Sequence, residues 1–152
     1  MENLKIKAQL LELCKASLET RLKSVLAVIN DLKQSLQSET KSSAGDKHET
    51  GRAMVQLERE KAGHQLAEIE KTKQVLSKIN PESFSKNVGL GSVVFTTKSN
   101  YFISISAGEL KVESGIFYAI SASTPIGQLL LGKSVGDKVV FREMKFKIIE
   151  VI

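Results

Sequence analysis

Apolar residues in the first quarter of the chain recur at alternating steps of four and three. The series is interrupted at Lys15, and its members are Leu4, Ala8, Leu11, Leu18, Leu22, Val25, Ile29, Leu32 and Leu36. A seam of this kind, sustained over about four heptads, is typical of a coiled-coil helix. No Gly or Pro occurs before Gly45. The pattern therefore predicts one long helix that continues to about Leu36.

A polar stretch separates this helix from a second one. Residues 37–51 are small or polar, which indicates a connection. The apolar period then resumes, and its members are Met54, Leu57, Ala62, Leu66, Ile69 and Leu76. The second helix should end near Ile79, because a residue before proline disfavours the helical region and Asn80 precedes Pro81. Two seams of similar length predict an antiparallel coiled-coil hairpin over residues 1–80, with its turn near residues 42–46.

The composition changes after Pro81. Short segments rich in β-branched and aromatic residues follow at close spacing, bounded by Gly, Ser and Asn, which is typical of short strands. They are residues 92–97, 101–105, 115–120, 138–141 and 145–152. Residues 98–100 and 107–108 have the composition of hairpin turns.

One segment of this second half carries the signals of a short helix. Thr124 offers an N-cap hydroxyl, Pro125 suits the first helical position, and Gly132 follows the apolar end. Residues 81–152 are therefore expected to form a small antiparallel β domain with one short helix. The predicted fold class is α+β, with two domains at 1–80 and 81–152.

Composition and charge exclude several classes of protein. The chain is 41% hydrophobic and 26% charged, which indicates a globular rather than a disordered protein. No apolar run approaches the roughly 20 residues of a membrane span, and no signal-peptide core follows Met1, so we expect a cytoplasmic protein without a membrane partner. Cys14 is the only cysteine. It lies among leucines, so we expect a buried thiol and no disulfide or cysteine-based zinc site.

The net charge of +5 is mild and spread over both halves. Residues 1–80 hold 14 Lys and Arg against 11 Asp and Glu, and residues 81–152 hold 8 against 6. A dedicated duplex-DNA-binding protein usually concentrates more basic charge on one face. These charge counts therefore indicate that neither half of the chain is a basic tail.

Two motifs resemble the bacterial Gre transcript cleavage factors. Gly45-Asp46-Lys47-His48-Glu49 lies at the predicted hairpin turn, where Gre factors carry an acidic tip. Residues 123–133, Ser-Thr-Pro-Ile-Gly-Gln-Leu-Leu-Leu-Gly-Lys, followed by Val-Gly-Asp at 135–137, are similar to the Ser-Pro-Ile-Gly signature of their C-terminal domain. The resemblance covers nearly the whole chain and keeps the order of hairpin and β domain.

This resemblance implies a transcription elongation factor that is not itself an enzyme. An FKBP-like C-terminal domain would dock on bacterial RNA polymerase, at the rim of the secondary channel, through Thr124, Pro125 and Ile126. The hairpin would then reach the active site, where Asp46 and Glu49 would help hold a second Mg²⁺ and stimulate cleavage of backtracked transcripts. The ion would be held only in the complex with the polymerase. The isolated chain, expected to be a monomer, would bind no cofactor stably.

The tip residues also have interpretations that need no polymerase. Asp46 and Glu49, three apart at a helix start, lie on one face and can approach the same cation, yet Asp-x-x-Glu is equally a capping box. Near the tip, Lys41, Lys47 and Arg52 could meet the phosphates of the nascent RNA 3′ end or simply be solvated. His48 lies between the carboxylates, but the other histidine, His64, is distant, so no zinc site is indicated.

The chain departs from the Gre pattern just after the tip. Gre factors usually follow the tip Glu with Asn and, three residues on, with an acidic–aromatic pair, whereas this chain has Thr50, Gly51, Arg52 and Ala53. A non-cleaving regulator of the polymerase secondary channel is therefore an alternative, and so is a coiled-coil interaction protein. A prolyl isomerase is suggested only by the implied fold, and this chain lacks the pocket Trp of those enzymes.

Overall fold

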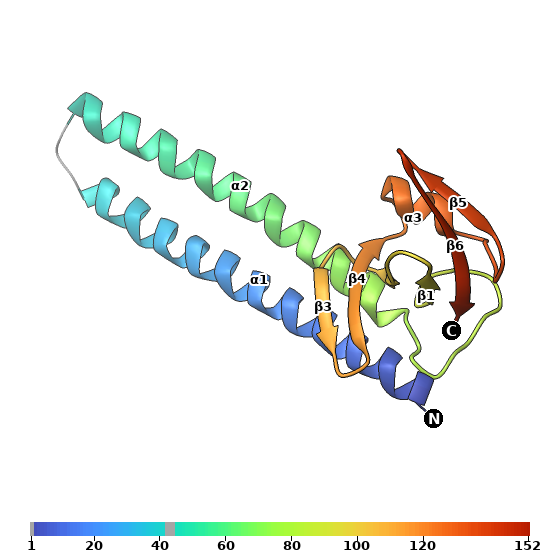
Figure 1. The fold of residues 1–152 in the computed structure, drawn as a ribbon. Coiled ribbons are helices and arrows are strands. Elements are labelled where there is room, and N and C mark those ends of the chain that lie inside the picture. The colour runs from blue at the N-terminus through green and yellow to red at the C-terminus, as the bar shows by residue number, and fades with distance from the viewer. Residues whose placement is uncertain (1, 42–44) are drawn as a thin grey trace. The chain divides into compact units, whose positions relative to one another are not determined.

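The structure, a computed structural model, describes residues 2–41 and 45–152, without the side chains of residues 39–41 and 45–50. Two long helices precede a six-stranded sheet with one short helix, so the chain is α+β, as predicted (Figure 1). In order, the elements are α1 (Glu2–Lys41), α2 (Gly45–Ser77), β1 (Val93–Thr96), β2 (Tyr101–Ser104), β3 (Gly108–Val112), β4 (Gly115–Ser121), α3 (Pro125–Leu130), β5 (Lys138–Phe141) and β6 (Met144–Val151). No helix in the described part of the chain is long and apolar enough to cross a membrane.

The chain forms two compact units that divide both long helices. One unit consists of Met1–Ser17 and Lys73–Ile152, and the other consists of Leu18–Thr72. The first turns of α1 and the last turn of α2 therefore cluster with the sheet. The remainder of α1 and α2 forms the second unit, called here the distal hairpin.

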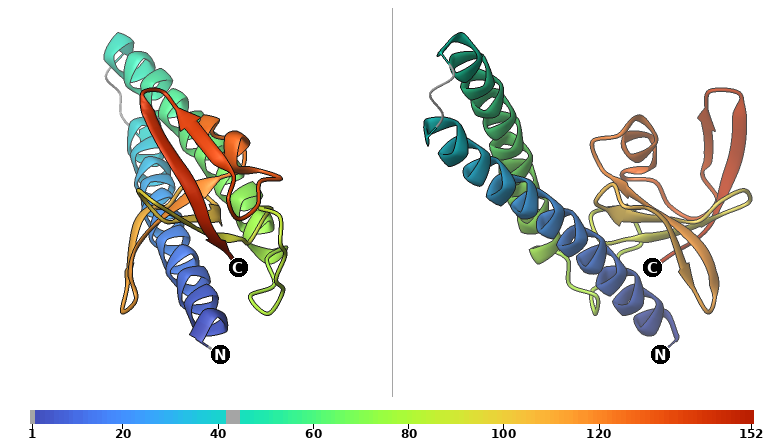
Figure 2. Two further views of the ribbon diagram at one scale, coloured as in Figure 1. Left: turned by 45° about the vertical axis from the view of Figure 1, so that its right-hand side comes forward. Right: turned by 90° about the vertical axis from the view of Figure 1, so that its left-hand side faces the viewer.

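The distal hairpin consists of two antiparallel helices that lie side by side (Figures 1 and 2). On α1 the predicted seam is confirmed within this unit, with Leu18 buried and Leu22 half-buried, whereas its first two members, Leu4 and Ala8, are exposed. On α2 the buried residues Ala62 and Ile69 are seven apart, which is one heptad. A single apolar stripe on each helix thus holds the two together.

Two members of the predicted α2 seam lie outside this stripe. Met54 is 64% exposed and Leu57 is 65% exposed, so their assignment to the seam is wrong. Val55, one residue after Met54, is half-buried instead and is seven residues before Ala62. At this end of α2 the buried stripe is therefore shifted by one residue. Where apolar residues are adjacent, the sequence pattern alone does not show which of them faces α1.

The predicted connection between the helices is also too long. Helix α1 continues to Lys41 and α2 already begins at Gly45, so most of residues 37–51 is helical. Polar residues continue a helix readily where no face has to be buried, and Gln, Glu and Lys have good helix propensity. Residues 42–44, at the expected turn, lie outside the described part of the chain.

The sheet has the strand order β3-β4-β2-β1-β6-β5. The β1–β2 hairpin across residues 98–100 is antiparallel, as predicted, with Val93 opposite Phe102. However, β2 and β4 are parallel, with Tyr101 opposite Tyr118, so the sheet is not purely antiparallel. Strand β3 intervenes in the chain and pairs only with β4.

Strand β3 is absent from the elements predicted from the sequence, which include a hairpin turn at residues 107–108 instead. Residue 108 is the first residue of β3. Strand β2 does not pair with β3, because β4 lies between them in the sheet. Leu110 is the only buried residue of β3. An edge strand with one buried side chain has too little apolar signal to be recognised from its composition.

One core of the sheet is formed by residues from α3, four of the strands and the segment before β1. It contains eight buried residues, Val88, Val94, Tyr101, Ile103, Leu130, Val139, Phe146 and Ile148. Strands β5 and β6 alternate between this core and solvent, so that their lysines point outward. This alternation fixes which of their side chains are available to a partner.

The start of α1 packs on the sheet within the same unit. Cys14 is fully buried, as predicted, and its Sγ lies 3.6 Å from Ser104 Oγ of β2. Lys7 is also buried; its Nζ donates a hydrogen bond of 2.5 Å to Ser83 O and lies 4.9 Å from the centroid of the Phe84 ring. Burial lowers the pKa of Lys7, while the carbonyl and the ring stabilise its charge.

Candidate functional site

The acidic motif lies in the first turns of α2, in the distal hairpin. Asp46 and Glu49 are three residues apart in this helix, a spacing that puts two positions on the same face. Their side chains, like those of Lys41 and Lys47, lie outside the described residues. The two residues are thus placed on the helix, and the geometry of their carboxylates stays a prediction.

The described residues next to the motif are exposed. Arg52 is exposed, as are the apolar side chains of Met54 and Leu57. All six Phe and both Tyr lie after Pro81 and the chain has no Trp, so the hairpin offers no Phe, Tyr or Trp ring on which a base could stack. Any contact of this region with nucleic acid therefore depends on charge and on aliphatic surface.

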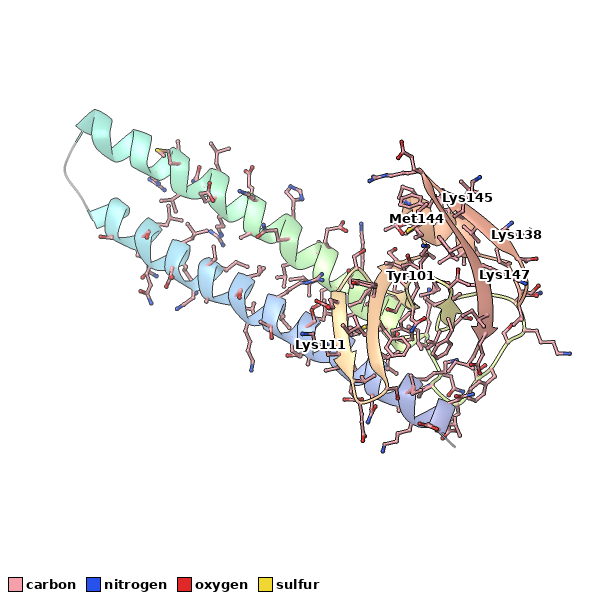
Figure 3. All side chains as sticks on the ribbon, viewed as in Figure 1. Tyr101, Lys111, Lys138, Met144, Lys145 and Lys147 are labelled. Carbon is pink, nitrogen blue, oxygen red and sulfur yellow. The ribbon has the colours of Figure 1, made fainter. Side chains whose placement is uncertain are left out.

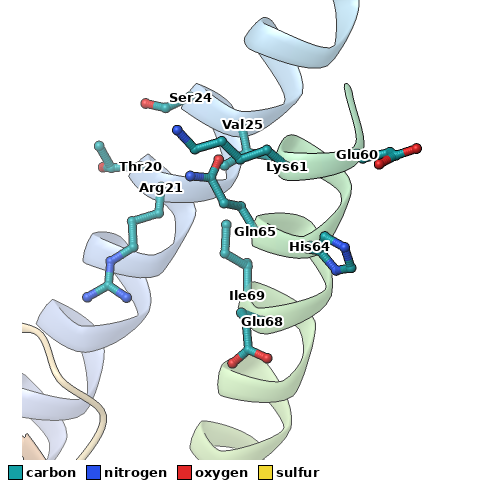
Figure 4. A pocket seen from close by; sticks show the side chains of 10 residues that line it. All are labelled: Thr20, Arg21, Ser24, Val25, Glu60, Lys61, His64, Gln65, Glu68 and Ile69. Carbon is teal, nitrogen blue, oxygen red and sulfur yellow. The ribbon is translucent and has the colours of Figure 1, made fainter. Parts of the chain in front are cut away.

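An open groove of about 810 Å³ runs between α1 and α2 in the distal hairpin (Figure 4). Lys61 and Gln65 point toward α1, whereas Glu60 and His64 point away from it. The remaining lining residues are Thr20, Arg21, Ser24, Val25, Glu68 and Ile69. No group of three or more metal-ligating side chains occurs there or elsewhere among the residues that the structure describes.

The donor set at the acidic motif fits a shared ion better than a self-sufficient metal site. Carboxylate oxygens suit Mg²⁺, which is commonly bound by one or two carboxylates together with ligands from elsewhere. Asp46 and Glu49 would supply those carboxylates, and a second molecule would have to complete the coordination. The residues at the motif therefore fit an ion that a partner already holds.

The second predicted site lies at the start of α3. Thr124 is the N-cap: its Oγ1 accepts a hydrogen bond of 3.1 Å from the Gly127 N–H and donates one of 2.7 Å to Ser121 O. Pro125 occupies the first helical position. The helix therefore starts as its sequence signals predict.

Gly127 shows how closely this turn is packed. A Cβ at this position would lie 2.3 Å from Ser121 O and 2.9 Å from Thr124 Oγ1. Gly127 is thus required by this turn, whether or not the motif also contacts a partner.

The three predicted docking residues differ in accessibility. Pro125 is exposed, Thr124 is half-buried by its capping bonds, and Ile126 packs against the core. Leu129 is 39% exposed and Leu131 is 40% exposed, although neither was singled out from the sequence. Pro125 and Leu129 are four residues apart, hence on one side of α3. A run of three leucines at the end of a six-residue helix could have revealed this, because such a short element cannot bury them all.

Together, the helical pair with an acidic motif at one end and the small sheet with a capped helix define an α+β protein with two separate candidate contact regions. No family model and no curated protein matches the chain. A solved structure, that of the transcription factor Gfh1, is similar at 20% identity and a TM-score of 0.34, over 88% of this chain and 90% of that one. Likeness at this level assigns neither family nor function.

Proposed function

We propose that this protein is a Gre-like transcription factor that binds bacterial RNA polymerase at its secondary channel and stimulates cleavage of backtracked transcripts. The observation that carries the proposal is the position of Asp46 and Glu49. Both lie where α2 begins, directly after the chain leaves the 40-residue helix α1. The resemblance of the acidic motif and of residues 123–137 to the Gre factors supports the same function.

The chemistry required of the chain is modest. Hydrolysis of a phosphodiester by two metal ions needs a hard cation beside the attacking water. Asp46 and Glu49 would bind that cation jointly with the polymerase and orient the water next to it. Because the polymerase retains the catalytic centre, this protein would act as a cofactor of the reaction and not as an enzyme.

The polymerase contact is assigned to the exposed side of α3. Pro125 and Leu129 present apolar surface there, and Thr124 holds the helix start in place. Ile126 belongs to the core, so its role in docking would be indirect. The affinity for the polymerase should therefore depend on Pro125 and Leu129 more than on the hairpin.

The test uses stalled, backtracked polymerase complexes with a radiolabelled transcript. Wild-type protein should shorten the transcript, with a rate that rises with Mg²⁺ concentration. The double variant Asp46→Asn with Glu49→Gln keeps side-chain size and removes both charges, so it should compete with wild type for the polymerase but fail to stimulate cleavage. A double variant that cleaves as well as wild type would contradict the metal role.

Docking is tested separately from cleavage. Pro125→Ala with Leu129→Ser should weaken competition for the polymerase, and Ile116→Ser, on a different exposed apolar residue, serves as the matched control. If the α3 variant binds the polymerase as tightly as wild type, α3 is not part of the interface.

A second candidate function is favoured by Thr50, Gly51, Arg52 and Ala53, which replace the residues that usually follow the acidic tip in Gre factors. A regulator that occupies the channel without promoting cleavage would have no need for those residues. It would inhibit nucleotide addition and leave backtracked transcripts intact at every Mg²⁺ concentration. The same cleavage experiment therefore separates the two functions.

A further inference from the structure

Three lysines gather on the exposed face of the β5–β6 hairpin, called here the basic face. They are Lys138 on β5 and Lys145 and Lys147 on β6 (Figure 3). Lys138 is directly opposite Lys147 in the strand register, and Lys145 is directly opposite Val140. A shallow hollow of about 510 Å³ between Thr97 and these strands is lined by all three lysines.

The sheet fixes the backbone that carries these side chains. On the opposite side of the hairpin, Val139, Phe146 and Ile148 are buried in the core, so the lysine face cannot turn inward. At Lys147, the backbone N–H donates a hydrogen bond of 3.0 Å to Thr97 Oγ1, and the carbonyl accepts one of 3.0 Å from the Thr97 N–H. The basic face is therefore a preformed, rigid surface with mobile charged ends.

The nearby carboxylates do not neutralise this face. Asp137 accepts hydrogen bonds from the backbone N–H and the hydroxyl of Ser134, at 2.8 Å and 3.4 Å. Glu143 lies in the turn and Glu150 near the end of β6. Among the residues that the structure describes, no ion pair is formed by any lysine of the basic face. Like charges directly opposite each other destabilise a strand pair, so the fold keeps Lys138 against Lys147 at some cost in stability.

We propose that the basic face binds the phosphate backbone of duplex nucleic acid, independently of base sequence. Lysine is a compact point charge suited to phosphates, and β5 and β6 carry no Asn, Gln or Arg with which to read a base edge. The exposed Arg142 lies in the turn between them, with its guanidinium 5.1 Å from the centroid of the Phe141 ring. Proteins that bind single strands add aromatic rings for base stacking, whereas Phe146 is buried here. Protein–protein interfaces are depleted in lysine, which disfavours an acidic polypeptide as the partner. The inference does not depend on the proposed cleavage function.

The salt dependence of binding provides a quantitative test. Binding of a fluorescent duplex of about 20 base pairs to the full chain is measured by anisotropy between about 50 and about 200 mM KCl. Three phosphate contacts contribute about −2.7 to the slope of log K against log salt, which is a roughly 40-fold fall in affinity over that range. The variant Lys138→Gln, Lys145→Gln, Lys147→Gln should lose this part of the slope and bind at least tenfold more weakly at the lowest salt.

The control is Lys23→Gln, Lys33→Gln, Lys73→Gln, which removes three exposed lysines of the helices and gives the same net charge. It should retain the wild-type slope. The basic-face variant should also melt at the wild-type temperature or above, because it relieves the repulsion between Lys138 and Lys147, so misfolding cannot account for its loss of binding. Equal losses in the two variants, no duplex binding by wild type at the lowest salt, or tighter binding of a single strand or a polyglutamate peptide of equal charge would each overturn the proposal.

Discussion

The distal hairpin and the unit that contains the sheet are built with very different amounts of core. Of the hydrophobic residues that are buried in the described chain, only Leu18, Ala62 and Ile69 belong to Leu18–Thr72, whereas the other 21 belong to the sheet unit. Each helix of the hairpin buries one stripe, while β2 is buried at every position and β5 and β6 bury alternate residues. The two units therefore differ in what holds them together.

This difference predicts a difference in local stability. Regions with few buried apolar contacts open at lower free energy than a packed core, and functional segments are commonly drawn from them. The hairpin bears the acidic motif and the sheet unit bears α3 and the basic face. The proposed metal-binding residues therefore lie in the unit with the lower expected local stability.

The largest effect is expected from Phe102→Ala. Phe102 is fully buried in β2, so its truncation should lower the free energy of unfolding of the sheet unit by about 3–5 kcal/mol. Leu22→Ala, at a half-buried position of α1, should cost less than about 2 kcal/mol. Urea unfolding followed by circular dichroism measures the first, and native-state hydrogen exchange of residues 18–38 measures the second. Equal costs at the two positions would contradict the contrast between the units.

A smaller loss is expected from Gly127→Ala. The added methyl group would meet a backbone oxygen, which cannot move aside as a flexible side chain can, so we expect a loss of about 1–3 kcal/mol. Gly89→Ala is the matched control, because a Cβ there would meet nothing within 4 Å. Thermal melts of both variants give the comparison. A Gly127→Ala protein as stable as the control would show that the turn before α3 relaxes easily.

The smallest effect, and one of opposite sign, is expected from Gly63→Ala in α2. Gly63 is exposed in the middle of the helix, and a Cβ there would have no neighbour within 4 Å. Alanine should therefore stabilise the distal hairpin by about 0.5–1 kcal/mol through its better helix propensity. Hydrogen exchange of residues 52–70 should slow, while exchange in the sheet should be unchanged. A destabilised hairpin would mean that the helices approach more closely at Gly63 than described.

The sequence by itself determined the features that depend on local signals. The 3.6-residue period of the helices, the Thr124 cap, Pro125 at the first helical position and the burial of Cys14 all follow from residues close together in the chain. The α1 seam is correct from Leu11 onward, where the apolar residues keep one heptad phase despite the interruption at Lys15. In α2, Met54 and Val55 are adjacent apolar residues, and only packing against α1 selects Val55.

The tertiary structure decided what depends on pairing between distant segments. The parallel pairing of β2 with β4 and the edge position of β3 bring together strands that local propensity cannot align. The same pairing sets Lys138 opposite Lys147, although the charges looked evenly spread along the chain. The restriction on Gly127 likewise comes from a carbonyl six residues earlier, which only the turn before α3 places beside it. The register of paired strands and the close approach of distant atoms exist only in the folded chain. They decide which residues lie together on one surface.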